Sequence, residues 1–171
     1  IDSITGLVTW EKTFPSVIKA TLFEEERRII FFYKNGTSLF VNLEDGNTLS
    51  EFDNQELDFR FSAINLIKNT LLLGTRNKKI SMFSLIDGKL MKAVDVSAIP
   101  LSIFWDGQDK LFWGDTRGFV NALSLRTGKL IWSKRNGASI SSIALTRSGI
   151  LVSSLDNFVY MLNERNGSVV W

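Results

Sequence analysis

The sequence predicts an all-β protein built from copies of one four-stranded unit. The first indication is a glycine that recurs along the chain at steps of 40, 42, 40 and 39 residues, at Gly6, Gly46, Gly88, Gly128 and Gly167. The second is a set of short apolar runs that keep fixed offsets from these glycines. A period near forty residues is typical of repeat architectures, in which each copy is one supersecondary unit.

Three apolar runs precede each of the last four glycines. The first run contains one of the residues Leu22, Ile64, Phe104 and Ile143. The second run covers 29–33, 71–74, 111–114 or 150–153. The third contains the pairs Phe40-Val41, Met82-Phe83, Ala122-Leu123 and Met161-Leu162. Short apolar runs between polar or glycine-containing segments favour strands over helices, and the unbroken second run predicts a strand buried on both faces.

A fourth apolar stretch follows the glycine, most clearly at 7–10, 130–132 and 169–171. The Asp-Gly, Thr-Gly and Asn-Gly pairs before it predict two-residue hairpin turns, because these residues tolerate positive φ. One four-stranded sheet cannot bury both of its faces alone, whereas sheets packed around a central axis can. We therefore expect a β-propeller with four-stranded antiparallel blades, and about four blades of a larger ring of six to eight.

We expect residues 1–171 to form a single propeller segment. Its units are a partial copy at 1–10 and fuller copies at 11–52, 53–94, 95–134 and 135–171. Both ends would leave strand edges unpaired, which proteins normally avoid. We therefore expect the remaining blades, or another subunit, to complete the ring.

The composition argues against several functions. The chain has no cysteine and no histidine, which excludes disulfides, Cys/His zinc sites and catalytic relays that need either residue. The net charge is only +2, with no basic stripe of the kind that binds nucleic acid. No apolar stretch approaches the roughly 20 residues of a membrane span. Without a calcium loop or a phosphate loop, we expect no enzyme, cofactor or catalytic metal.

The segment 118–132, with the sequence GFVNALSLRTGKLIW, resembles the repeat of the pyrroloquinoline-quinone (PQQ)-like propellers. Residues 157–171 are a second good copy, and 5–10 match its closing half. Two units are degenerate, because Ser50 and Lys92 stand at the tryptophan position. WD repeats are a poorer match, since their Gly-His element needs a histidine.

The resemblance implies roles for the tryptophans. In this family the closing tryptophan packs between adjacent blades, so Trp10, Trp132 and Trp171 are expected in the core. Trp113 follows the register of a buried second strand and is expected there as well. Trp105 stands at a position that tolerates polarity, where either inter-blade packing or a contact at the rim is open.

Degenerate repeats without cofactor ligands resemble the propeller lipoprotein of the outer-membrane β-barrel assembly machine. The resemblance implies a non-catalytic, periplasmic or otherwise exported scaffold, which docks partner proteins within a larger assembly through loops on one face. Two alternatives stay open. One is a luminal stress-sensor domain in the endoplasmic reticulum; the other is a fragment of a quinoprotein dehydrogenase, a class that usually carries a vicinal cysteine pair. A cytoplasmic location also stays open.

The charged residues suggest which face docks. In a propeller, loops between second and third strands share a face with the connections between blades. That face gathers the basic residues Lys34, Arg76, Lys78, Arg117, Lys134 and Arg135, against the acidic residues Glu56, Asp58 and Asp156. We expect it to bind an acidic protein segment, with Trp105 as a further candidate contact. The acidic residues Asp106, Asp109 and Asp115 are expected to serve solvated turns.

Overall fold

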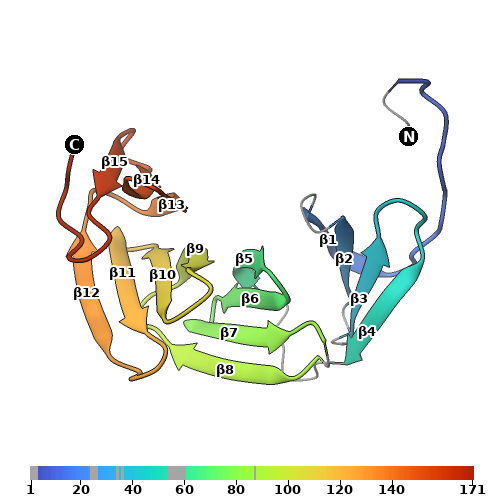
Figure 1. Cartoon of the computed structure of the whole chain (residues 1–171), viewed down its shortest axis with the longest axis horizontal. Helices are drawn as coiled ribbons and strands as arrows, with labels where there is room; N and C mark the ends of the chain where they lie inside the picture. Colours follow the sequence, from blue (N-terminus) through green and yellow to red (C-terminus); the bar gives the residue numbers. More distant parts are fainter. Residues whose placement is uncertain (1–3, 24–26, 34, 36, 54–60, 87) are drawn as a thin grey trace. The chain divides into compact units, whose positions relative to one another are not determined.

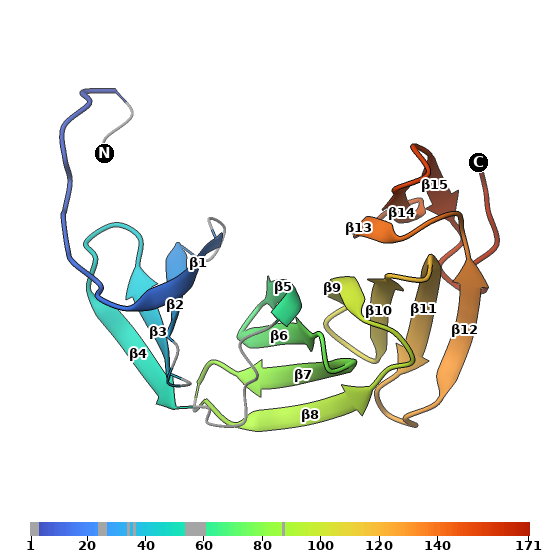
Figure 2. The ribbon, with the colours of Figure 1, turned by 180° about the vertical axis from the view of Figure 1, so that it is seen from behind.

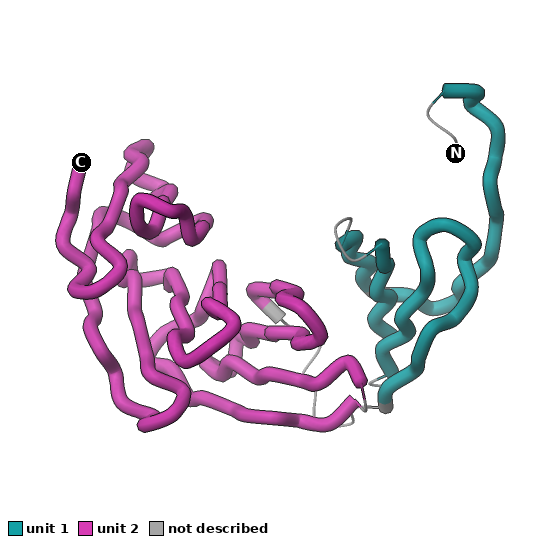
Figure 3. The backbone as a smooth tube through the Cα atoms, in the orientation of Figure 1, with its two compact units in different colours: residues 1–59 teal, residues 60–171 magenta. Residues whose placement is uncertain are grey.

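The computed structural model describes residues 4–23, 27–33, 35, 37–53, 61–86 and 88–171. These residues form strands and turns and contain no helix (Figure 1). They divide into two compact units, Ile1–Phe59 and Arg60–Trp171, which are coloured separately in Figure 3 and described separately below. The organisation of 1–171 as one propeller segment stays a prediction.

The first unit contains one antiparallel sheet with the strand order β1-β2-β3-β4. Its strands are β1 (Val17–Phe23), β2 (Arg28–Tyr33), β3 (Thr37–Asn42) and β4 (Thr48–Asp53). The buried apolar side chains come from the two central strands and are Ile30, Phe32, Phe40 and Val41.

The second unit contains three antiparallel sheets. The first is made of β5 (Phe61–Ile67), β6 (Thr70–Thr75), β7 (Lys79–Ser84) and β8 (Leu90–Asp95). The second is made of β9 (Pro100–Trp105), β10 (Lys110–Asp115), β11 (Phe119–Ser124) and β12 (Leu130–Arg135). The third is made of β13 (Ile140–Thr146), β14 (Gly149–Ser154) and β15 (Val159–Leu162), and a single bridge joins Leu162 to Val169.

The predicted fold class is confirmed. The four runs expected as second strands fall within β2, β6, β10 and β14, each in the second place of its sheet. Consecutive sheets of the second unit pack through their first strands, since β9 contacts both β5 and β13. The outermost strands β8 and β12 lie on the opposite side of their sheets in both views (Figures 1 and 2). This arrangement is that of neighbouring propeller blades.

Gly46, Gly88 and Gly128 lie in the turn between third and fourth strands, as predicted, and Gly167 lies between β15 and the bridge at Val169, but the turn is longer than two residues. Around Gly46, the amide of Asn42 donates to the carbonyl of Asn47 (2.8 Å), and the amide of Gly46 donates to the carbonyl of Asn42 (3.0 Å). Four residues, 43–46, therefore lie between the paired positions. Among these residues only Gly46 has a positive φ, of 67°. The same two bonds recur around Gly88, Gly128 and Gly167.

Each complete sheet has a bulge at the start of its fourth strand. On β12, Leu130 pairs with Leu123 but Trp132 already pairs with Ala122, so Ile131 is an extra residue. The same shift occurs in the β3–β4 and β7–β8 pairs. A bulge bends an edge strand and leaves its extra residue unpaired. It explains why two consecutive residues, Leu130 and Ile131, are both exposed before the buried Trp132.

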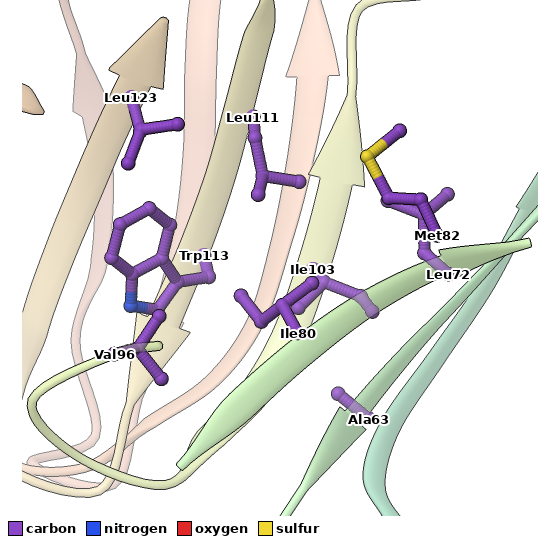
Figure 4. Close-up of a cluster of buried hydrophobic side chains, with 9 residues drawn as sticks. All are labelled: Ala63, Leu72, Ile80, Met82, Val96, Ile103, Leu111, Trp113 and Leu123. Carbon is purple, nitrogen blue, oxygen red and sulfur yellow. The ribbon is translucent and has the colours of Figure 1, made fainter. Parts of the chain in front are cut away.

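Two apolar cores join the three sheets of the second unit. Figure 4 shows the first, in which side chains of β5–β7 meet those of β9–β11 around Trp113. The second joins β10–β12 to β13–β15 and includes Phe112, Trp132 and Ile140. Because β10 contributes Leu111 and Trp113 to one core and Phe112 to the other, it is buried on both faces.

Burial on both faces holds for two of the four second strands. β6 is buried throughout and β10 almost throughout, whereas β2 and β14 alternate between buried and partly exposed residues. For those two strands the prediction from the unbroken apolar runs is wrong. In the case of β14, the second unit supplies a packed sheet on one face only.

Candidate docking surface

The loops at one end of the strands form a continuous row in the second unit. Each turn between a second and a third strand is hydrogen-bonded to a connection between sheets. The bonds run from Val96 N to Lys78 O (2.8 Å), from Thr116 N to Ile99 O (3.0 Å), from Asn136 N to Gly118 O (2.8 Å) and from Leu155 N to Ser139 O (2.9 Å). These backbone bonds fix the loops of three sheets against one another, so they present one face.

Five of the predicted contact residues lie on this row. Arg76, Lys78 and Arg117 stand in turns between second and third strands, and Lys134 and Arg135 end β12. All five side chains are exposed. The structure therefore brings these five residues to one face, and we call them the basic face. The sixth residue, Lys34, lies outside the described residues.

Arg117 is held in place by its neighbours. Its guanidinium donates to Ser97 Oγ (2.6 Å) and lies over the ring of Phe119, 5.6 Å from the centroid. Its backbone amide and that of Phe119 donate to the carboxylate of Asp115 (2.9 and 3.1 Å). Asp115 is fully buried, so this turn is built around a carboxylate that backbone amides stabilise.

A groove of about 510 Å³ opens beside Arg117. Its lining residues are Thr116, Arg117, Phe119, Arg135, Ala138 and Ser139. The hydroxyl of Ser139 donates to the carbonyl of Thr116 (2.6 Å), which ties the two sides of the groove together. Arg135 lies directly across from Phe119 in the β11–β12 pair. The groove thus combines two guanidinium groups with an aromatic ring.

Asp156, in the turn between β14 and β15, lies against this row, because a Cβ on Gly137 would meet its carboxylate. Asp156 accepts hydrogen bonds from the hydroxyl of Tyr160 (2.7 Å) and the amide of Phe158 (3.0 Å). The Tyr160 hydroxyl is the main cause that lowers the pKa of Asp156 below its ordinary value. The same bond raises the pKa of Tyr160. Asp156 is therefore ionised, with part of its hydrogen-bonding capacity already used.

Trp105 lies away from the basic face. It ends β9, whereas the connection that joins the loop row precedes Pro100 at the other end of the strand. Its ring packs against the core of Figure 4, and its Nε1 donates to the carbonyl of Gln108 (3.3 Å). Trp105 is thus an inter-sheet packing residue, and we leave it out of the proposed surface.

The three acidic residues of the second sheet shape turns. Asp106 accepts a hydrogen bond from the amide of Gln108 (2.8 Å). Asp109 accepts from the amide of Arg126 (2.7 Å) and from the hydroxyl of Ser124 (2.9 Å), and these bonds, the first above all, lower its pKa. In the part of the chain that the structure describes, no three acidic side chains gather as they would around a metal ion.

The closing tryptophans behave differently from one another. The indole N–H of Trp132 donates to the carbonyl of Glu164 (2.9 Å), and that of Trp10 donates to Leu43 (2.8 Å). Trp132 is buried, as is Trp113, which agrees with the prediction. Trp171 is 62% exposed, so its predicted place in the core is wrong for this structure. The third sheet is the last of its unit, and no sheet within that unit packs on the face beyond it.

Sequence reasoning missed the uncharged part of the groove. Phe119, Ala138 and Ser139 lack a signal of their own, because aromatic, small and hydroxyl residues occur throughout the strands and turns. Phe119 opens an apolar strand and was assigned only to the repeat pattern. A comparison between repeats would not have marked it either, because the equivalent residues are Thr37 and Lys79 in the two preceding sheets but Phe158 in the following one.

The sheets are arranged as the blades of a β-propeller, and the repeat motifs resemble those of PQQ-like propellers. Residues 96–171 match a family model of such repeats, described as "Outer membrane protein assembly factor BamB". This part of the chain is therefore similar to the PQQ-like repeats, as the motifs at 118–132 and 157–171 predicted. No curated protein matches the chain.

Solved structures support the fold. The crystal structure of the computationally designed Ika8 protein is similar, with a TM-score of 0.69 at 15% sequence identity. The similarity covers 89% of this chain and 47% of the Ika8 chain, so this chain spans about half the length of that protein. At this identity the similarity shows the fold alone. Within the described residues there is also no helix with the length and apolar character needed to cross a membrane.

Proposed function

We propose that this chain is a non-catalytic, exported scaffold that docks an acidic protein partner through the basic face. The family match supports the scaffold, because the model that fits residues 96–171 is named for an assembly factor of the outer membrane. The basic face supports docking. The same family match supports an exported location and membership in a larger assembly.

The observation that carries the proposal is the excess of basic side chains on one face. Arg76, Lys78, Arg117, Lys134 and Arg135 are all exposed, and none of them forms an ion pair among the described residues. Cations clustered on one rigid surface raise the local concentration of an oppositely charged partner and accelerate its association. A surface of this kind selects acidic partners mainly through the rate of association.

The test compares two triple variants of equal charge change. In the first, Arg76, Arg117 and Arg135 of the basic face become Glu. In the control, Arg126, Arg147 and Arg165, which lie in turns at the opposite end of the strands, become Glu. Exposed charges contribute about 0–1 kcal/mol to stability, so both variants should fold with melting temperatures close to that of the wild type.

Binding is measured by surface plasmon resonance to an immobilised acidic polypeptide over a salt series. We expect the first variant to associate at least tenfold more slowly at low salt, and the control to keep most of the rate. We also expect the wild-type rate to fall as salt increases, because screening weakens interactions between exposed charges. Equal loss in both variants would mean that only net charge matters, and the proposed surface would be wrong.

A further inference from the structure

The groove between Phe119 and Arg135 departs from the pattern of the preceding repeats. The position of Arg135, seven residues after the turn glycine, holds Asp53 and Asp95 in the two earlier units. The position of Phe119 holds Thr37 and Lys79. In the preceding sheet, Lys79 therefore lies opposite Asp95 in the strand pair, and opposite charges face each other. In the groove, an aromatic ring lies opposite an arginine.

This exchange gives the groove a second guanidinium group where the preceding units have a carboxylate. Arg135 is exposed and forms no ion pair among the described residues. Arg117 is positioned by Ser97 and by the ring of Phe119. The carboxylates of Asp115 and Asp156 lie near the groove, but their oxygens accept from backbone amides and the Tyr160 hydroxyl and form no ion pair with Arg117 or Arg135, so both guanidinium groups remain open to a ligand.

The lining of the groove also selects against a purely ionic ligand. Phe119 is half-buried and Ala138 is exposed beside it, so the two give the groove an apolar side. The hydroxyl of Ser139 donates to the Thr116 carbonyl, which holds the wall of the groove in one position. A ligand that fills the groove must therefore place an anion near the guanidinium groups and an apolar group near Phe119.

Resting on the proposed function, we infer that this groove takes one carboxylate side chain and an adjacent apolar side chain from an extended segment of the partner. Arginine suits this role, because its planar guanidinium matches the geometry of a carboxylate with two parallel hydrogen bonds. Burial of the apolar side chain against the Phe119 ring adds affinity that salt does not screen. The groove is thus the anchor, and the other cations of the basic face steer the partner toward it.

The test uses variants that restore residues of the preceding repeats. R135D introduces the acid found in those units, and F119T introduces the threonine of the first unit. R147D makes the same charge change at the opposite end of the strands and is the matched control. Thermal melts and near-ultraviolet circular dichroism of each variant report whether it folds as the wild type does.

The probes are short synthetic peptides measured by fluorescence anisotropy. The reference peptide contains Glu next to Leu in an acidic, extended sequence; in one variant Gln replaces this Glu, and in a second Ser replaces the Leu. We expect wild-type protein to bind the reference peptide about tenfold more tightly than either variant, the size of change that about 1.4 kcal/mol produces. R135D should lose the preference for Glu over Gln, F119T should lose that for Leu over Ser, and R147D should keep both.

The outcomes separate this inference from the proposed function. If the triple Arg→Glu variant of the basic face loses binding while R135D and F119T bind as the wild type does, the basic face stands and the groove is not the anchor. If the wild type binds no acidic peptide at low salt, both are wrong. If it prefers a phosphoserine peptide or a single-stranded oligonucleotide, the groove recognises phosphate and the carboxylate assignment is overturned.

Discussion

The ammonium group of Lys92 donates a hydrogen bond to the carbonyl oxygen of Leu125 in the following sheet. That carbonyl precedes the turn glycine, Gly128, by three residues. The indole of Trp132 bonds to Glu164, which stands three residues before Gly167. Lys92 thus stands where other repeats have tryptophan and contacts the same backbone acceptor. The unit with Lys92 is degenerate in sequence, but it keeps the hydrogen bond to the backbone carbonyl that the tryptophan makes in other units.

Lys92 does not pack an aromatic ring on the glycine turn as Trp132 does, and restoring this packing should stabilise the protein. An added Cβ at Gly128 would meet nothing within 4 Å, whereas one at Gly167 would lie against the ring of Trp132. We therefore expect K92W to fill the open space over the Gly128 turn while its indole N–H replaces the ammonium. The expected gain is about 0.5–2 kcal/mol in the free energy of unfolding, as for other cavity-filling substitutions. Urea denaturation measures it.

The control for this prediction is K92M, which keeps a long apolar side chain without a donor. It should leave the Leu125 carbonyl without this partner and should not gain stability, because an unmade hydrogen bond costs about 1 kcal/mol. A K92W protein no more stable than K92M would show that the space over Gly128 does not accept the ring.

Alanine at two equivalent turn glycines should have different costs. Gly128 and Gly167 have φ values of 69° and 68°, so the backbone penalty of about 1–2 kcal/mol is shared. At Gly167, however, a Cβ would come within 2.5 Å of Cε3 of Trp132. We expect G167A to cost about 1–3 kcal/mol more than G128A, as overpacking does. Equal losses in a denaturation experiment would contradict the packing of Trp132 on this turn.

Gly114 controls how closely the second and third sheets of the second unit approach. It lies within β10, and a Cβ there would overlap the side chain of Ile140 at the start of β13. G114A should therefore destabilise the protein by about 1–3 kcal/mol through overpacking. The double variant G114A/I140A should lose less than the sum of the single losses, because removing the Ile140 methyl groups relieves part of the overlap. Strict additivity would place the clash elsewhere.

The strands could be predicted because the same pattern of apolar runs recurs in every repeat. Apolar runs at fixed offsets from a glycine placed all four second strands, and Asp-Gly and Asn-Gly pairs placed the turns. The length of the turns and the bulge beside Ile131 could not be predicted. Both depend on how the backbone of the third strand pairs with the fourth, and a run such as Leu130-Ile131-Trp132 fits a regular or a bulged strand equally well.

The sequence predicted the basic residues of the candidate site but not the groove between them. Loop position alone placed Arg76, Arg117 and Arg135 on one face, because the topology of a blade decides which turns share an end. The groove beside Phe119 arises from contacts between one sheet and the connection to the next, which the sequence does not encode locally. The burial of Trp171 was predicted wrongly, because the closing tryptophan of a repeat is buried against the next sheet. Within the second unit, no sheet packs on that side of the third sheet.

The bond between Tyr160 and Asp156 should make one loop sensitive to pH at both extremes. The folded-state pKa of Asp156 is lowered, chiefly by the Tyr160 hydroxyl, so its stabilisation is present above the unfolded-state pKa of about 3.9 and is lost as pH falls. The folded-state pKa of Tyr160 is raised, chiefly by Asp156, so its stabilisation is present below about 10 and is lost as pH rises. Between these limits both effects act together.

Y160F removes the hydroxyl and keeps the ring. We expect it to lower the melting temperature at pH 7, and we expect the difference from the wild type to narrow toward pH 2 and toward pH 11. D156N, which keeps the shape of the side chain without its charge, should likewise flatten the acid limb of the melting profile. Differential scanning calorimetry across this range gives the comparison. A difference between wild type and Y160F that stays constant from pH 2 to pH 11 would mean that the hydroxyl acts through packing and not through its bond to the carboxylate.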